Sequence, residues 1–185
     1  MVTELDPHLE VITGCMSSGK SEELIRRLTR AKIAELNIIV FKPAVDTRTG
    51  AEIKSRSGGS VLATIVKSPA EILDYVQDHH AVVGIDEAHF FPMELIGVVE
   101  KLILQGKHVI VSGLDLDYRG QTFGPMGELM VRAYPVHKLT AVCMKCKKNY
   151  ATRSQRLVDC KDLELVGDKE YEPRCLKCYQ PPSEK

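Results

Sequence analysis

The sequence predicts an α/β fold: a parallel sheet with helices on both faces, followed by a small cysteine-rich module. Two observations predict it. Between residues 9 and 113, short apolar runs alternate with amphipathic stretches, the pattern of parallel strands joined by right-handed crossovers. Beyond about Pro135 the alternation stops and cysteines occur in pairs. We therefore expect two domains, residues 1–138 and 139–185.

The elements of the first domain begin with a short apolar strand over residues 9–13. Apolar residues then recur at helical spacing, which predicts a helix over residues 21–36. Residues 37–43 predict a buried strand, because they are rich in β-branched side chains and close with a proline. Residues 44–60 hold Ser, Thr, Gly and alternating charges, so we expect a mobile loop there.

The next helix has a recognisable start. Ser68 is a candidate cap, Pro69 suits the first helical position, and Glu71 stands three residues after the cap. The elements expected from here on are a helix over 68–77, a strand over 81–87, a helix over 92–106 and a strand over 107–113. These strands are continuous apolar runs, as expected for a sheet that is covered on both faces.

The overall charge excludes no function, but it does not favour a polyanionic partner. Twenty-five basic and twenty-five acidic residues cancel, which gives no electrostatic reason to expect a nucleic acid or an anionic membrane as partner. The chain has no signal-peptide pattern and no apolar run of the roughly 20 residues that cross a bilayer. We therefore expect a cytoplasmic protein, in which six cysteines favour metal binding or catalysis over disulfides.

A phosphate-binding motif follows the first predicted strand and opens the first predicted helix. It fits G-x-x-x-x-G-K-[ST] at every fixed position and consists of Gly14, Cys15, Met16, Ser17, Ser18, Gly19, Lys20 and Ser21. Its glycines allow backbone N–H groups to point at phosphate oxygens, and the helix N-terminus adds positive potential. Lys20 is placed to reach the β- and γ-phosphates of ATP, and Ser21 to bind Mg²⁺. The alternative is a Gly/Ser-rich turn that matches the motif by chance. The strand predicted before the motif and the helix predicted after it disfavour this alternative.

Two carboxylates end the third predicted strand. Asp86 is expected to hold Mg²⁺, and Glu87 stands where a base could meet an attacking nucleophile. The alternative is a pair of surface acids that cap the next helix, and only the upstream phosphate-binding motif favours the catalytic interpretation. The sequence therefore predicts in-line transfer of the γ-phosphoryl group of ATP·Mg²⁺ to an alcohol.

Four cysteines form two C-x-x-C pairs that are separated by 28 residues. They are Cys143, Cys146, Cys175 and Cys178. Four thiolates at this spacing suit a structural Zn²⁺ that clamps the segment 147–174 like a lid. Two disulfides or an iron–sulfur site are the alternatives. Cys15 and Cys160 have no such partners, and we interpret them as ordinary small side chains.

Taken together, these motifs closely resemble the type II (cytosolic-type) thymidine kinase family. The resemblance rests on the phosphate-binding motif, on residues 86–87 followed by Phe90-Phe91-Pro92, on residues 113–115 and on the cysteine pairs, and it spans about residues 9–179. It implies a P-loop NTPase (RecA-like) sheet, a zinc domain with a lasso loop and a homotetramer. It also implies thymidine and ATP as substrates, with dTMP supplied to DNA synthesis by salvage.

The resemblance also implies roles for individual residues. Glu87 would be the base that accepts the proton of the thymidine 5′-hydroxyl, and Arg48 would steady phosphate charge. The residues that match positions around the thymine ring are Met16, Phe90, Leu114 and Tyr118, and those in the lasso stretch are Thr152, Leu163, Leu165 and Tyr171. One departure is His89, because the family more often has Gln at that position.

Two other functions stay open from the sequence alone. Residues 86–89 spell the Asp-Glu-Ala-His box of nucleic-acid-dependent ATPases, although such motors need two RecA-like domains and 185 residues hold one. Alternatively, the cysteine pairs form a zinc-ribbon adaptor for nucleic acid. The lysines around the pairs that would serve it are Lys145, Lys147, Lys148 and Lys177.

Overall fold

The computed structural model describes residues 6–48, 50–55, 58–160, 162–163, 165–167 and 169–182. Its centre is a six-stranded sheet with the order β5-β2-β6-β7-β1-β8, and every neighbouring pair is parallel. The strands are β1 (Leu9–Gly14), β2 (Ile38–Pro43), β5 (Thr64–Val66), β6 (Val82–Ile85), β7 (His108–Gly113) and β8 (Val136–Leu139). The predicted parallel sheet is therefore confirmed.

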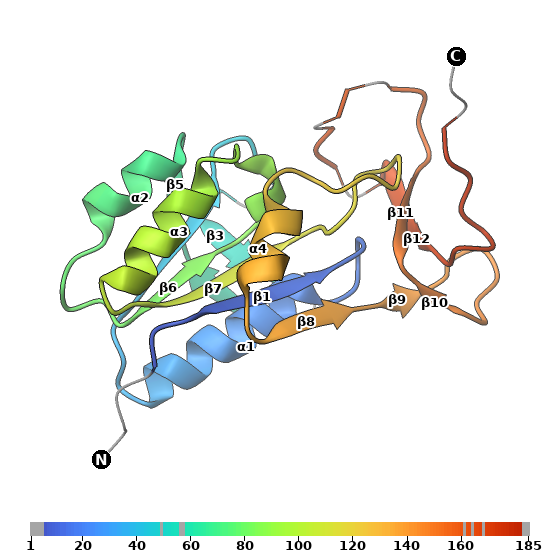
Figure 1. The fold of residues 1–185 in the computed structure, drawn as a ribbon. Helices are drawn as coiled ribbons and strands as arrows, with labels where there is room; N and C mark the ends of the chain where they lie inside the picture. Colours follow the sequence, from blue (N-terminus) through green and yellow to red (C-terminus); the bar gives the residue numbers. More distant parts are fainter. Residues whose placement is uncertain are drawn as a thin grey trace.

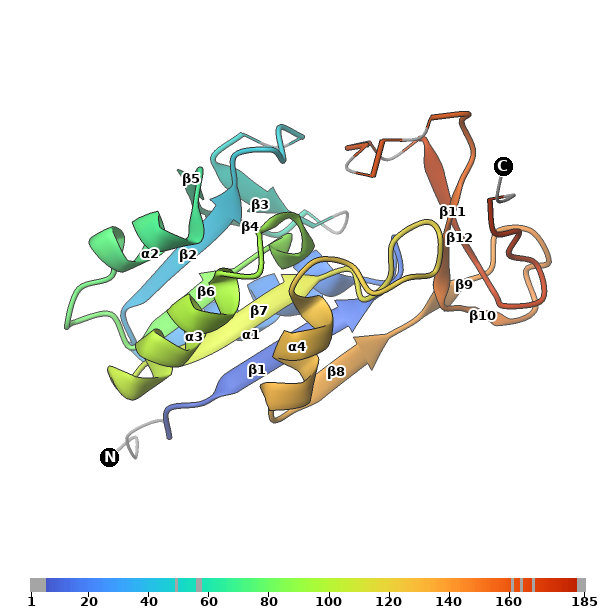
Figure 2. The same ribbon diagram turned by 45° about the horizontal axis from the view of Figure 1, so that its top comes forward.

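Helices cover both faces of this sheet, as the sequence predicts (Figures 1 and 2). Helix α1 (Lys20–Ile33) lies on one face. The other face carries α2 (Pro69–Tyr75), α3 (Leu95–Leu104) and α4 (Met126–Arg132), and a short 3-10 helix η1 (Ala88–Phe90) follows β6. No helix among the described residues is long and apolar enough to span a membrane.

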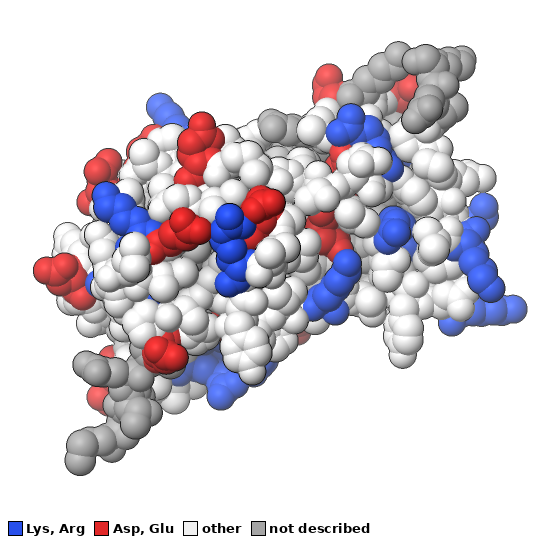
Figure 3. All heavy atoms as spheres, viewed as in Figure 1, with Lys and Arg blue, Asp and Glu red and all other residues white. Residues whose placement is uncertain are grey.

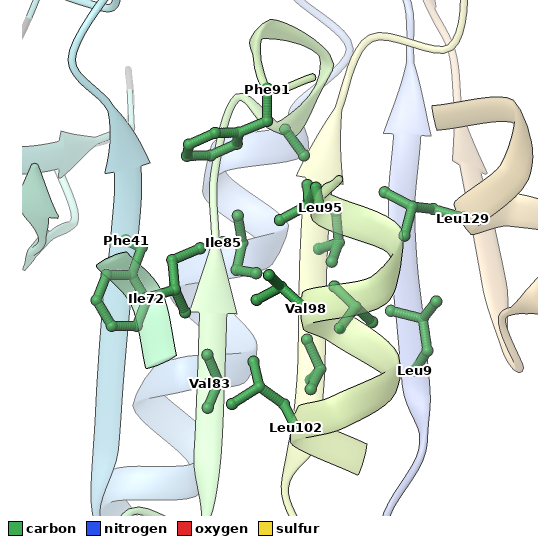
Figure 4. Close-up of a cluster of buried hydrophobic side chains, with 14 of the residues drawn as sticks. Leu9, Phe41, Ile72, Val83, Ile85, Phe91, Leu95, Val98, Leu102 and Leu129 are labelled. Atoms are coloured by element: carbon green, nitrogen blue, oxygen red, sulfur yellow. The ribbon is translucent and has the colours of Figure 1, made fainter. Parts of the chain in front are cut away.

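The sheet has two hydrophobic cores because successive strand residues point to opposite faces. Leu9 and Val11 of β1 belong to the core beneath α2, α3 and α4, whereas Ile12 of the same strand faces α1. Figure 4 shows the first core, in which Leu102 of α3 packs towards Val83 of β6. These apolar contacts hold the strand ends in a fixed arrangement.

The segment 44–60 is not simply the mobile loop that we expected. β3 (Glu52–Lys54) and β4 (Ser60–Leu62) pair there as an antiparallel hairpin. Ile53 and Val61 are buried and belong to the core beneath α1, which explains why this polar segment forms strands. Thr49, Arg56 and Ser57 lie outside the described residues.

Helix starts and ends also differ from the expectations by a few residues. Helix α1 ends at Ile33, α2 ends at Tyr75, and α3 begins at Leu95 after the 3-10 turn. Ser68 is the N-cap of α2, but its side chain makes no capping hydrogen bond. The carboxylate of Glu71 instead accepts the Lys67 N–H at 3.1 Å.

The alternation continues one unit beyond the expected end. Helix α4 and strand β8 were not identified in the sequence, and β8 extends the parallel sheet beside β1 through Leu139. The C-terminal module follows, with the antiparallel pairs β9 (Ala141–Val142) with β10 (Tyr150–Ala151) and β11 (Arg153–Arg156) with β12 (Tyr171–Arg174). The division into domains at residue 138 stays a prediction.

Charges on the visible face are distributed unevenly (Figure 3). Acidic and basic side chains are mixed over α2, α3 and α4, whereas basic side chains gather at the end that β9 and β10 occupy. The lysines around the cysteine pairs are exposed: Lys145, Lys147, Lys148 and Lys177. The expectation that no nucleic acid binds there stays a prediction.

The two-core packing can be tested on α3, which carries a buried and an exposed leucine. Leu102 is fully buried, whereas Leu104 is 88% exposed. We expect Leu102→Ala to lower the free energy of unfolding by about 2–5 kcal/mol, because it removes buried methyl groups and leaves a cavity. The matched control Leu104→Ala should change it by less than about 0.5 kcal/mol. Urea unfolding measures both, and equal effects would contradict this packing.

Candidate active site

A cavity of about 270 Å³ lies at the carboxyl ends of the parallel strands, where open α/β sheets bind ligands. The predicted site residues that line it are Met16, Ser17, Ser18, Gly19, Lys20, Ser21, Arg48, Asp86, Glu87, Phe90, Leu114, Tyr118, Leu163, Leu165 and Tyr171. Gly14, Cys15 and Thr152 do not line it. The structure thus gathers most of these residues around one space, while their individual roles stay predictions.

The phosphate-binding loop joins β1 to α1. Gly14 has φ +140°, and a Cβ at this position would lie 2.2 Å from the Leu139 carbonyl oxygen, so the loop requires glycine there. Gly19 is the N-cap of α1, so the N-terminus of this helix faces the cavity. The Lys20 ammonium donates to the Cys15 carbonyl at 2.9 Å. Burial lowers the pKa of Lys20.

Two carboxylates extend from the end of β6 to the cavity wall. Asp86 is 5% exposed, and burial together with the negative charge of Glu87 raises its pKa to about 7. Glu87 has φ +51° and ψ 38°, a left-handed backbone conformation that residues other than glycine rarely adopt. Such strain is concentrated at functional sites. Here the left-handed turn lies at the junction between β6 and η1, where the chain changes direction beside the cavity.

A chain of charged side chains holds Arg48 against Glu87. Lys42, itself buried, donates to Asp46 at 2.8 Å. Asp46 accepts from Nε of Arg48 at 2.6 Å, and Nη2 of Arg48 donates to Oε1 of Glu87 at 2.6 Å. Asp46 thus orients the guanidinium between itself and the second carboxylate.

These neighbours decide the protonation of Glu87. Burial alone would raise the pKa of Glu87, but its interactions with His89 and with the cations Arg48 and Lys20 outweigh burial and hold that pKa below the ordinary value. Glu87 is therefore ionised at neutral pH. An ionised carboxylate beside a cavity can accept a hydrogen bond from a hydroxyl group and take its proton.

The cavity has an apolar and aromatic wall next to the carboxylates. Phe90 and Phe123 meet edge to face, with ring centroids 5.8 Å apart, and Met16 and Leu114 also line this space. The adjoining lasso stretch contributes Leu163, Leu165 and Tyr171. A flat, mostly apolar ligand group fits such a wall.

Arg156 ties the lasso stretch to the main body. Its guanidinium lies 3.5 Å above the Tyr118 ring centroid and donates to the Tyr171 hydroxyl at 3.1 Å through Nε. It also donates to the carbonyl oxygens of Cys160 at 2.7 Å and Leu163 at 3.3 Å. The sequence analysis missed this residue, because one arginine in a polar stretch carries no signal of its own.

The C-terminal module is also attached directly to the phosphate-binding loop. The Met16 N–H donates to Oγ of Ser154 at 3.0 Å, and the Cys15 thiol donates to the Ala151 carbonyl at 3.2 Å. Cys15 is therefore more than the small filler that we expected. Thr152, which follows Ala151, bonds within the C-terminal module instead: its N–H donates to the Arg174 carbonyl at 3.1 Å.

Other lining residues were not singled out from the sequence. They include Asp46, Ser55, Leu116, Asp117, Phe123, Ser154 and Val166. The scarcity of aromatic residues, with only four Phe in the chain, was the one signal that could have drawn attention to Phe123. The others depend on contacts between distant segments, which spacing does not reveal.

The four paired cysteines form a cluster that could hold a metal ion. Their sulfur atoms all lie within 4.8 Å of one another, and Sγ of Cys146 is 4.0 Å from Sγ of Cys175. Four thiolates around Zn²⁺ are separated by about 3.8 Å, so the arrangement fits. Backbone N–H groups, foremost that of Cys146, lower the pKa of Cys143 to about 6, whereas a hydrogen bond with Cys175 raises the pKa of Cys178 to about 12. All four cysteines are free of disulfides.

A second group of potential ligands lies at the opposite, amino ends of the strands. It consists of His8, Glu10 and His108, whose ligand atoms lie within 4.8 Å of one another. Arg27 of α1 already forms an ion pair with the buried Glu10 carboxylate. Because this guanidinium supplies the positive charge, we interpret the group as a structural ion pair and not as a cation site.

The family assignment agrees with this geometry. A family model described as thymidine kinase matches residues 7–179. The chain belongs to the thymidine kinase family. The predicted resemblance is thus confirmed, and membership of the thymidine kinase family makes the chain a kinase of nucleotide salvage. The parallel sheet and the four-cysteine cluster are consistent with a thymidine kinase of this family.

Proposed function

We propose that the chain transfers the γ-phosphate of ATP to the 5′-hydroxyl of thymidine and so produces dTMP. One observation carries the proposal: a single cavity is lined by the phosphate-binding loop, by Glu87 and by an apolar wall. A triphosphate and a nucleoside that share this cavity would have their reacting groups close together. Membership of the thymidine kinase family supports the substrate class.

The phosphate-binding loop and its cations would bind the phosphate groups of ATP. The backbone of residues 14–21 would cradle the triphosphate, with Lys20 against its terminal phosphates. Mg²⁺, held by Ser21 and Asp86, would neutralise phosphate charge when bound. Burial and the charge of Glu87 raise the pKa of Asp86, and a cation bound beside it would lower that pKa again and favour the ionised carboxylate.

Arg48 links the two ends of the reaction. In the proposed reaction its guanidinium turns from Oε1 of Glu87, 2.6 Å away, towards the charge of the transferring phosphoryl group. Asp46 would keep the arginine within reach of both positions, because it bonds Nε and leaves the far end of the side chain to turn. When the Arg48 guanidinium turns away from Glu87, the proton affinity of the Glu87 carboxylate rises. This happens at the step in which the carboxylate must accept the hydroxyl proton.

The apolar wall and the lasso stretch would bind the nucleoside. Phe90, Leu114 and Tyr118 would enclose the thymine ring, and Arg156 would keep the lasso over it through Tyr118 and Tyr171. Exclusion of water by this cover would protect ATP from hydrolysis. Zn²⁺ on the four cysteines would fix both ends of the lasso segment, and the family resemblance supports a cytoplasmic homotetramer.

The base assignment predicts a specific defect in Glu87→Gln. The amide keeps the size of the side chain but cannot accept the hydroxyl proton, so kcat for thymidine should fall about 10²- to 10⁴-fold. Binding of ATP should persist, because the phosphate-binding loop is unchanged. Steady-state kinetics and ATP titration measure both, with the exposed Glu94→Gln as matched control. Full activity in Glu87→Gln would refute the assignment.

The lasso assignment predicts a selective effect of Arg156→Met. The substitution removes the contacts with Tyr118 and Tyr171, so KM for thymidine should rise about tenfold while KM for ATP changes less than about twofold. Arg153→Met, on the same strand, is the control, because its guanidinium donates to Thr152. A rise in both KM values would contradict a role confined to the nucleoside.

The zinc assignment predicts about one Zn²⁺ per chain in the purified protein, which elemental analysis measures. Cys175→Ser should lose the ion, because three thiolates and a hydroxyl bind Zn²⁺ more weakly than four thiolates. The chain offers a matched control in Cys160→Ser, since Cys160 lies outside the cluster. Retention of a full zinc complement by Cys175→Ser would count against the site.

A further inference from the structure

We propose that His89 is a positioning residue for Glu87: its Nε2–H donates a hydrogen bond to Oε2 of that carboxylate. The inference rests on the proposed function, in which Glu87 is the base. It gives a task to a histidine that the sequence singled out without a role. Three features carry it: the burial of the ring, its tautomer and the direction of its second nitrogen.

The imidazole is tightly packed in the wall of the cavity. His89 is 2% exposed, and its ring packs against Phe90 and Phe123, with centroids 4.2 and 4.6 Å away. Its backbone is enclosed as well, because a Cβ at Gly124 would lie 2.4 Å from the His89 carbonyl oxygen. The ring therefore has little freedom to rotate.

The backbone of Leu114 decides which nitrogen carries the proton. The Leu114 N–H donates to Nδ1 of His89 at 3.1 Å, so Nδ1 must be unprotonated. Burial lowers the pKa of His89 to about 4, and the ring is therefore neutral at neutral pH. A neutral imidazole whose Nδ1 is an acceptor carries its hydrogen on Nε2.

The protonated nitrogen faces the proposed base. Nε2 of His89 lies 3.4 Å from Oε2 of Glu87, and it has no hydrogen-bond partner among the described residues. A buried N–H without an acceptor is costly, and the carboxylate oxygen is the acceptor within reach. Oε1 of the same carboxylate already accepts from Arg48. In this proposal the two oxygens of Glu87 are divided between an arginine and a histidine.

This division matters once Arg48 turns towards phosphate charge. The His89 N–H then remains on Oε2 and keeps the carboxylate in orientation, while Oε1 is released for the substrate hydroxyl. Because the same ring binds the Leu114 backbone, it fixes the base relative to the wall of the nucleoside pocket.

Two substitutions separate the hydrogen bond from the bulk of the ring. His89→Gln retains an acceptor for Leu114 and a donor for Glu87, so kcat should stay within about threefold of the parent protein. His89→Leu fills the space without a donor, and its kcat should fall about ten- to a hundredfold, with a smaller change in KM. His108→Leu is the matched control, because His108 also has its pKa lowered to about 4 by burial but lies at the opposite end of β7.

Nitrogen-15 NMR of the histidine rings tests the tautomer in the parent protein, so the proposal does not depend on the folding of His89→Leu. The signal absent from His89→Gln identifies His89, and we expect a protonated Nε2 and an unprotonated Nδ1 at pH 7. A proton on Nδ1 would overturn the proposal. Equal losses of kcat in His89→Gln and His89→Leu would also overturn it.

The same measurements distinguish this proposal from the function on which it rests. Full thymidine turnover in Glu87→Gln would refute the base assignment, whatever the His89 variants do. If Glu87→Gln is inactive but His89→Leu keeps the parental kcat, only the positioning role of His89 fails. Inactive Glu87→Gln, a lowered kcat in His89→Leu and rescue of kcat by His89→Gln support both.

Discussion

Parallel pairing of β1 with β7 and of β6 with both β7 and β2 is the constraint on which the candidate site depends. Parallel strands end at one edge, so segments that are distant in the sequence meet there. The phosphate-binding loop, the carboxylates after β6 and Leu114 after β7 are neighbours for this reason. Two buried cores hold the strands in register and so fix the distances at that edge.

Attachment of the C-terminal module to this edge is a second organising feature. Ser154 accepts the Met16 N–H, and Ala151 accepts the Cys15 thiol, so the module is bonded to the loop that would hold phosphate. Arg156 connects the same module to Tyr118 at the other side of the cavity. The lasso stretch and the contacts with the phosphate-binding loop thus belong to one small module, which also contains the four-cysteine cluster.

The sequence predicted the parts of the molecule that depend on local pattern. Buried strands such as β6 and β7 appear as continuous apolar runs, and the P-loop has fixed residues at fixed spacing. The β3–β4 hairpin was missed because its burial depends on contact with α1, and the polar composition of the segment does not indicate that contact. Arg156, Phe123 and the histidine tautomer were missed because each is defined by a partner far away in the sequence.

The left-handed backbone at Glu87 has a consequence for how this protein can change over time. A glycine or an asparagine would adopt that conformation at lower cost, so substitutions that remove the carboxylate can make the fold more stable. Selection for thermal endurance alone would therefore tend to erase the proposed chemistry at this position. Only selection for turnover would keep a strained glutamate there, which is a trade-off between durability and activity at a single residue.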